Sequence, residues 1–148
     1  MKYLLFLGFA FSFSYTSKAQ ANSKDSLEVA AVIHKMFTAM KTSDTNMLKS
    51  CFSTTAVFQT IVNKNGNAEV RNELVQDFIN SIGKQIVGAL DERITISSLL
   101  IDANLASVWT PYQFYYKGQY SHQGVNSFQL VKFIEGWKIQ YLIDTRRK

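Results

Sequence analysis

Apolar side chains recur every three or four positions between residues 29 and 40, and this period predicts an amphipathic helix. Asp25 followed by Glu28 is typical of a helix start, with Asp25 as the cap and Glu28 reaching back to it. The expected inner positions of this helix are Val29, Ala30, Ile33, Met36, Phe37 and Met40. A second, short helix is predicted to begin at Asp44 and to carry Met47, Leu48, Cys51 and Phe52.

The middle of the chain predicts a hairpin followed by a third helix. Residues 56–62 have the composition of a strand, and the Asn-Lys-Asn-Gly sequence at 63–66 favours a tight turn into a short partner strand around 69–71. A helix is expected over residues 73–82, and Gly83 would end it. Its predicted inner positions are Leu74, Val75, Phe78 and Ile82.

Large residues alternate through residues 106–147, in three aromatic-rich segments separated by turns at 117–118 and 135–136. This pattern predicts an antiparallel meander, preceded by one long strand over 92–101. Pro111 has no N–H to donate, so a bulge or sharp bend is expected beside it. Helices grouped against successive antiparallel strands indicate an α+β fold, with three helices packed on one strongly curved antiparallel sheet and a hollow between them.

The length of 148 residues suggests a single domain, preceded by a segment that resembles a secretory signal peptide. Lys2 supplies a positive start, residues 3–15 are almost wholly apolar or aromatic, and Ser17-Lys18-Ala19 has the small residues of a cleavage site. A retained membrane anchor is the alternative, but the apolar run is shorter than the roughly 20 residues of a spanning helix. We therefore predict an exported domain over residues 20–148, periplasmic or secreted, without stable membrane insertion after cleavage.

Charge and cysteine content exclude several classes of protein. Loss of Lys2 and Lys18 lowers the basic count from 16 to 14 against 11 acids, a net charge of +3. The basic residues cluster only at the C-terminal end, 146–148, so a nucleic-acid partner is not expected. Cys51 is the single cysteine, cannot form an internal disulfide, and fits the apolar rhythm of a buried residue.

The order of predicted elements resembles the nuclear transport factor 2-like superfamily, a cone-shaped α+β fold shared with ketosteroid isomerase and scytalone dehydratase. The resemblance covers residues 20–148 and is strongest where His122-Gln123-Gly124, Gly136-Trp137 and Asp144-Thr145 stand. It extends to small exported bacterial members, some labelled lumazine-binding or polyketide cyclase-like (SnoaL-like). The superfamily includes enzymes, binding proteins and assembly modules. Residues 45–68 contain no acid, which departs from the isomerases, whose carboxylate base follows the second helix.

A candidate site follows from the predicted register of the meander. If Tyr116 and Tyr120 flank a three-residue turn and the next hairpin closes similarly, Asn126 lies between Thr110 and Asp144 in one row. The residues expected near that row are Tyr112, Phe114, His122 and Arg146. A polar row bordered by aromatic residues suits a small hydrophobic or aromatic molecule. The ligand-binding candidates are Trp109, Thr110, Tyr112, Phe114 and Asn126.

The catalytic candidates are His122, as general acid or base, and Asp144, as its orienting group or as a base. The alternative for His122 is a surface or core-edge histidine bonded to a neighbour, and His34 is expected at a helix rim. Two histidines without a third ligand do not predict a metal site, and neither a phosphate-binding loop nor another cofactor motif is present.

Three functional hypotheses remain at this level. The first is an exported binding protein with an aromatic-lined pocket, and the second is an isomerase, lyase or cyclase using His122. The third is a non-catalytic assembly module. The hairpin around Tyr112 and Tyr120 sends aromatic residues to both faces of the sheet, so we expect a homodimer formed through the outer face.

Overall fold

The computed structural model describes residues 16–148, with side chains from Lys24 onward. Its helices are α1 (Thr16–Thr42), α2 (Thr45–Lys49) and α3 (Val75–Gly83). Most of the signal peptide predicted over residues 1–19 lies outside the described residues. Among the residues described, no helix combines the length and apolar character needed to cross a membrane.

A single seven-stranded sheet carries the fold, in the order β2-β1-β7-β6-β5-β3, with β4 also paired to β5. The strands are β1 (Phe52–Lys64), β2 (Asn67–Glu73), β3 (Leu90–Ile94), β4 (Ser98–Asp102), β5 (Leu105–Tyr116), β6 (Gln119–Phe133) and β7 (Gly136–Arg147). The expectation of a wholly antiparallel sheet is wrong at one pairing. Strands β1 and β7 run parallel because the chain crosses from β1 through α3 and the meander before it returns beside β1.

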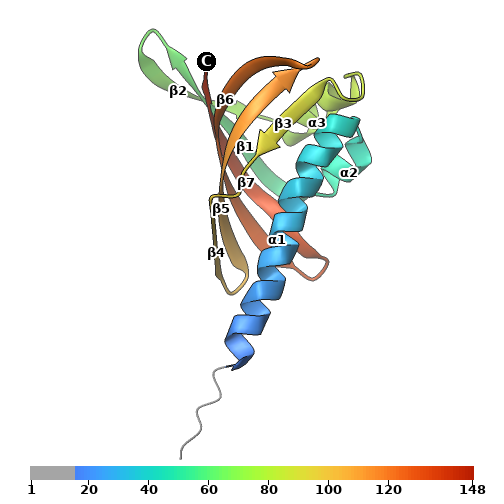
Figure 1. Cartoon of the computed structure of the whole chain (residues 1–148), viewed down its shortest axis with the longest axis vertical. Helices are drawn as coiled ribbons and strands as arrows, with labels where there is room; N and C mark the ends of the chain where they lie inside the picture. Colours follow the sequence, from blue (N-terminus) through green and yellow to red (C-terminus); the bar gives the residue numbers. More distant parts are fainter. Residues whose placement is uncertain (1–15) are drawn as a thin grey trace, which may run out of the picture.

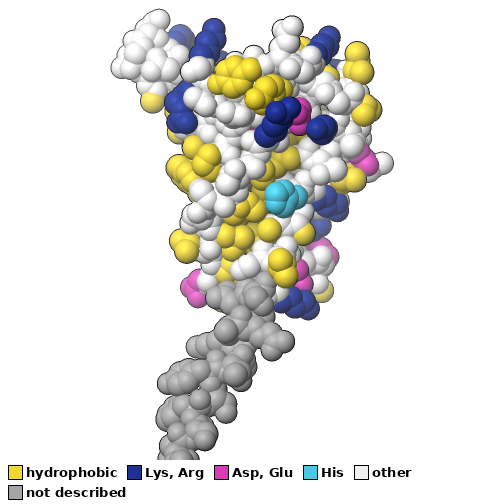
Figure 2. Space-filling model, viewed as in Figure 1, with side chains coloured by type: hydrophobic (Ala, Val, Ile, Leu, Met, Phe, Trp, Pro, Cys, Tyr) yellow, Lys and Arg dark blue, Asp and Glu magenta, His cyan; other side chains and the backbone are white. Residues whose placement is uncertain are grey.

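The sheet curves around the helices, and α1 runs along its concave side (Figure 1). Side chains from α1 and from alternate positions of β5, β6 and β7 fill the space between them. The largest fully buried residues are Phe128, Ile33, Leu48, Leu130, Ile139 and Leu142. Hydrophobic side chains also reach the surface in a band over the sheet beside α1 (Figure 2). The α+β cone expected from the sequence is confirmed by this arrangement.

The start of the first helix differs from the expectation, and the start of the second confirms it. Asp25 lies inside α1, where its carboxylate accepts hydrogen bonds from Lys132 Nζ and from Trp137 Nε1, so it fastens the helix to the β6–β7 hairpin. Asp44 caps α2 by accepting a 2.8 Å hydrogen bond from the Met47 N–H.

Helix α3 begins later than expected. Leu74 is its N-cap residue, with an extended backbone and 72% of its surface exposed, so it does not belong to the inner face. Phe78, Ile79 and Ile82 are the buried residues of α3. Phe78 packs edge-on against Phe58 of β1, with the ring centroids 4.9 Å apart.

The strand predicted over residues 92–101 is divided into β3 and β4, opposite Pro111. Ile94 pairs with Tyr112 and Ser98 with Trp109, so three residues (95–97) lie against two. Pro111 has no N–H, and its carbonyl oxygen accepts a 3.0 Å hydrogen bond from Thr95 N. The irregularity expected beside Pro111 therefore falls in the partner strand.

The β5–β6 turn contains two residues, not the expected three. Lys117 and Gly118 both have positive φ, 50° and 79°, as a tight hairpin turn requires. An extra residue, Ser121, then bulges from β6 and restores the register, so Phe114 still pairs with His122. A second shift, at Gln129, lies between β6 and β7. The predicted pairs Thr110–Asn126 and Asn126–Asp144 are both present.

Candidate functional site

A cavity of about 140 Å³ lies between the helices and the concave face of the sheet. Both the helices and the sheet contribute to its apolar walls, which are formed by Met36, Phe37 and Met40 of α1, Phe78 and Ile82 of α3, and Phe58, Leu90 and Leu142 of the strands. Polar side chains gather in the same lining: Glu92, Tyr112, His122, Asn126, Asp144 and Arg146, together with Phe114. The cavity is thus mostly hydrophobic, with a concentrated polar part.

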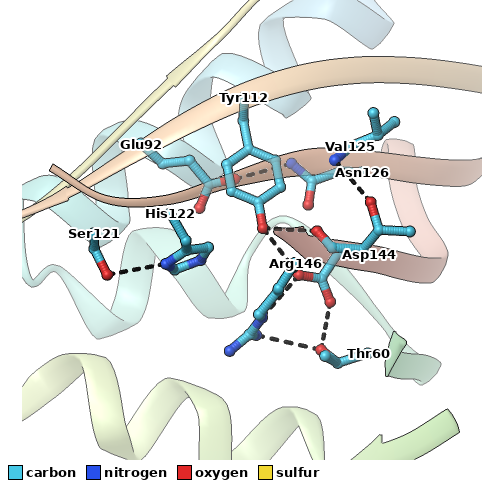
Figure 3. A network of polar contacts seen from close by, with 10 residues as sticks. Thr60, Glu92, Tyr112, Ser121, His122, Val125, Asn126, Asp144 and Arg146 are labelled. Atoms are coloured by element: carbon cyan, nitrogen blue, oxygen red, sulfur yellow. Dashed lines mark hydrogen bonds and ion pairs between the residues drawn. The ribbon is translucent and has the colours of Figure 1, made fainter. Parts of the chain in front are cut away.

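Asp144 is the centre of the polar network in the cavity wall and is only 5% exposed. Three donors point at its carboxylate in Figure 3: the Thr60 hydroxyl, the Tyr112 hydroxyl at 3.3 Å and Arg146 Nε at 3.0 Å. Arg146 also donates to Thr60 Oγ1 at 3.2 Å, which orients that hydroxyl toward Asp144. The negative charge of Asp144 is therefore compensated within the protein by a charge-assisted hydrogen bond.

Glu92 of β3 also lines the cavity, and its Oε1 accepts a 2.9 Å hydrogen bond from Asn126 Nδ2. Burial raises the pKa of the Glu92 carboxyl to about 7, against the lowering effect of Asn126, and the Asp144 charge raises it further. Glu92 is not among the site residues predicted from the sequence. Its position carries a signal, because it lies two residues from Leu90 and from Ile94, inward positions of the same strand.

Gly124 allows Tyr112 to reach across the sheet. Tyr112 pairs with Gly124, and its hydroxyl donates across β6 to the Thr145 carbonyl oxygen of β7 at 2.9 Å. A Cβ on Gly124 would lie 1.8 Å from that carbonyl oxygen and 2.8 Å from the Tyr112 ring. Glycine is thus required by the close approach of both groups. Burial and the nearby Asp144 charge raise the pKa of Tyr112, so its phenol is protonated at neutral pH.

His122 lines the cavity but is not linked to Asp144. Its Nδ1 lies 3.0 Å from Ser121 Oγ, and its ring packs against Phe114, with centroids 5.0 Å apart. Burial lowers the pKa of His122, and the charge of Arg146 lowers it further, so the imidazole is neutral at pH 7. The carboxylate of Asp144 is bonded to other donors, so the predicted pairing of Asp144 with His122 is absent.

The other predicted ligand-binding residues divide between cavity and outer positions. Tyr112, Phe114 and Asn126 line the cavity. Trp109 lies on the opposite face of β5 and is 49% exposed, because alternation along the strand turns it away from the helices. Thr110 lies on the inner face, fully buried, and its Oγ1 has no hydrogen-bond partner within the described part of the chain.

In the described part of the chain, no three His, Cys, Asp or Glu side chains are grouped as metal ligands would be. The two cavity carboxyls have separate protein partners: Asn126 for Glu92 and Arg146 for Asp144. What the arrangement offers chemically is one charge-compensated carboxylate, one carboxyl that titrates near neutrality, and a protonated phenol.

Comparison with solved structures identifies the fold. A protein of unknown function from Shewanella baltica, described as NTF2-like, is 16% identical with a TM-score of 0.67, over 90% of this chain and 98% of that chain. A Nostoc punctiforme domain with a cystatin-like fold is 20% identical with a TM-score of 0.64, over 90% and 80%. A proposed dehydratase of the NTF2-like family from Streptomyces avermitilis is 13% identical with a TM-score of 0.63, over 86% and 99%.

The chain therefore has the nuclear transport factor 2-like cone fold. No family model matches the sequence. No curated protein matches it either. At these identities the likeness concerns the fold, so the function has to be argued from the cavity itself.

Proposed function

We propose that the protein binds a small, largely apolar molecule, about one ring in size, inside the cone. The cavity is the observation that carries this proposal. An apolar cavity of about 150 Å³ in another protein holds benzene, and the cavity here has a volume of about 140 Å³. Its polar groups would orient the ligand while the apolar walls supply most of the binding free energy.

The expected affinity follows from ligand size. At about 0.5 to 1 kcal/mol per heavy atom, a ligand of about eight heavy atoms binds with a Kd between about 1 mM and 1 µM. A bicyclic ligand of lumazine size suits this volume less well. We therefore favour a single-ring ligand over lumazine, the ligand suggested by the resemblance to members labelled lumazine-binding. The resemblance to polyketide cyclase-like members is likewise a second proposal.

Two methionines make the proposal directly testable. Met36 and Met40 line the cavity, whereas Met47 of α2 does not. In protein labelled with ¹³C at the methionine methyls, benzyl alcohol and related single-ring compounds should shift the Met36 and Met40 signals saturably and leave Met47 in place. Equal shifts of all three, or no shift at ligand concentrations of several millimolar, would contradict the proposal.

A second candidate function is proton transfer in an isomerase, lyase or cyclase, and Glu92 favours it. A carboxyl whose pKa is raised to about 7 can both accept and release a proton at neutral pH, which general acid–base catalysis requires. Glu92 suits this role better than His122, whose pKa is lowered and whose Nδ1 contacts Ser121. Tyr112 and Asn126 would then polarise the substrate.

The test of this second candidate is hydrogen exchange in the bound molecule. Single-ring ketones that shift the Met36 and Met40 signals should exchange their α-protons in D₂O faster with wild-type protein than with Glu92→Gln. Equal exchange rates with wild type and Glu92→Gln would exclude proton transfer by Glu92 and would leave ligand binding as the proposed function.

We also propose that the chain is exported after cleavage behind Ala19 and that two copies pair through the outer face of the sheet. Exposed apolar residues on that face support the pairing: Val57, Val70, Leu100 and Trp109. Sedimentation should give a dimer for wild type and a monomer for a variant that combines Leu100→Asp and Trp109→Asp.

The proposed export has its own test: the N-terminal sequence of protein purified from the native host should begin at Gln20. An assembly module without a ligand would show the dimer but no methyl shifts.

A further inference from the structure

The charges lining the cavity do not balance. Two carboxyls, Glu92 and Asp144, and one guanidinium, Arg146, contribute to the wall. Arg146 is joined to Asp144 by a 3.0 Å ion pair. Across residues 24–148, no ion pair involves Glu92, whose carboxyl is held by the neutral amide of Asn126. One carboxylate in a mostly apolar cavity is therefore left without a cation.

The apolar walls are suited to a positive charge as well as to a hydrocarbon. Phe37, Phe58 and Phe78 line the cavity, with Tyr112 and Phe114 beside its polar groups. The electron-rich faces of such rings attract cations, and the attraction grows when water is excluded. Aromatic walls around a single unpaired carboxylate are a combination that recognises organic ammonium groups.

We propose that the ligand is a small organic amine, bound as its ammonium ion, with the charge against Glu92 and a hydrocarbon part of about one ring in the apolar end. This inference rests on the proposed binding function and specifies the class of ligand. Asn126 holds one oxygen of Glu92 at 2.9 Å, and so fixes the carboxylate while leaving its other oxygen for the ligand. The ammonium supplies the missing positive charge of the cavity.

The groups facing Glu92 decide how binding depends on pH. Asp144 and Arg146 of β7 face it as a pair of opposite charges, and His122 of β6 is neutral at pH 7. Tyr112 of β5 stays protonated, and α1 contributes the apolar Met36, Phe37 and Met40 to the cavity. Glu92 is thus the group in this wall whose charge changes near neutrality.

The sign of the pH dependence separates this ligand from a neutral one. An ammonium ligand needs ionised Glu92, so its affinity rises as the pH rises through about 7. From pH 6 to pH 8 the ionised fraction increases about tenfold, and the Kd should fall by the same factor. A ketone or other acceptor needs the protonated carboxyl, and its affinity would fall over the same range.

Three ligands of matched shape provide the test: benzylamine, benzyl alcohol and benzoate, titrated calorimetrically against the full domain at pH 6 and pH 8. Benzylamine should bind at least tenfold more tightly than benzyl alcohol at pH 8, with benzoate weakest. Its Kd should be about tenfold higher at pH 6. Glu92→Gln, which keeps an acceptor for Asn126, should abolish both the preference and the pH dependence.

The control variant is Glu69→Gln, because Glu69 is a partly exposed acid of β2 outside the cavity lining, paired with Lys64 and Arg71, and its change should leave all three affinities unaltered. Glu92→Asp keeps the carboxylate and should retain part of the preference for the amine. It therefore keeps the proposal testable if Glu92→Gln fails to fold. If benzyl alcohol bound as tightly as benzylamine at both pH values, the proposal of an amine ligand would be wrong, while the proposal of a small-molecule-binding cavity would stand. Failure of all three compounds to bind would instead remove the proposed function.

Discussion

Asn126 and Glu92 are joined by a 2.9 Å hydrogen bond although they lie on β6 and β3, strands that are separated by β5. The bond crosses the concave face of the sheet within the cavity wall. It aligns the carboxyl that titrates near neutral pH, and it opposes the effect of burial on that pKa. The properties of Glu92 therefore depend on a residue far away in the sequence.

Asn126→Ala should raise the pKa of Glu92 further above 7, because the donor that favours its charged form is lost. The shift can be followed from the ¹³C resonance of the Glu92 carboxyl. Gln129→Ala removes a comparable amide bond, to Ser107, outside the cavity lining and serves as the control. An unchanged Glu92 titration in Asn126→Ala would show that the bond does not set this pKa.

Stability should depend on pH through Glu92. Its pKa in the folded state is raised to about 7 from an ordinary value of 4.5, so the folded protein binds the extra proton between these values. The stabilising contribution is complete below about pH 4.5 and is lost as pH rises toward 7, by up to about 3 kcal/mol. Urea unfolding at several pH values gives the free energy of unfolding of wild type and of Glu92→Gln. Between pH 4.5 and 7 this free energy should fall more steeply for wild type, and parallel pH dependences would refute the prediction.

Gly124→Ala should destabilise the fold by about 2 kcal/mol or more, because the new methyl would overlap the Thr145 carbonyl and the Tyr112 ring. Gly66→Ala provides the comparison. Gly66 has a positive φ of 85° but open space around it, so that substitution should cost only about 1 kcal/mol of backbone strain. Equal melting temperatures for the two variants would argue against the close approach of Tyr112.

Asp144→Asn should cost about 1–3 kcal/mol, since Arg146 loses its ion pair and the hydroxyls of Thr60 and Tyr112 lose a charged acceptor. A double-mutant cycle with Arg146→Met isolates the pair. We expect the double variant to be more stable than the sum of the two single changes predicts. Additive free energies of unfolding would mean that the ion pair contributes nothing.

Local patterns were sufficient to predict the helices, most strands and the row of residues across β5, β6 and β7. Thr110, Asn126 and Asp144 are aligned as expected even though the first turn has two residues, because the bulge at Ser121 compensates for the shorter turn. Alternation along a strand fixes which face a residue occupies, so a correct register places several side chains at once.

The parts that were not predicted depend on contacts between distant segments. The parallel pairing of β1 with β7 leaves no local signal in either strand. Glu92 looked like an ordinary strand charge, and only the neighbouring cavity and Asn126 give it a role. Asp25 has the pattern of a helix cap, but it lies inside a longer helix, where its carboxylate is paired with Lys132 of β6.

The binding of an amine inside the cone can be seen in a crystal structure of the domain soaked with benzylamine at pH 8. We expect electron density for one aromatic ring packed against Phe58, Phe78 and Leu142 inside the cavity, with the amine nitrogen within hydrogen-bonding distance of Glu92. A cavity closed by its own side chains, or density for the compound only on the outer surface, would contradict it.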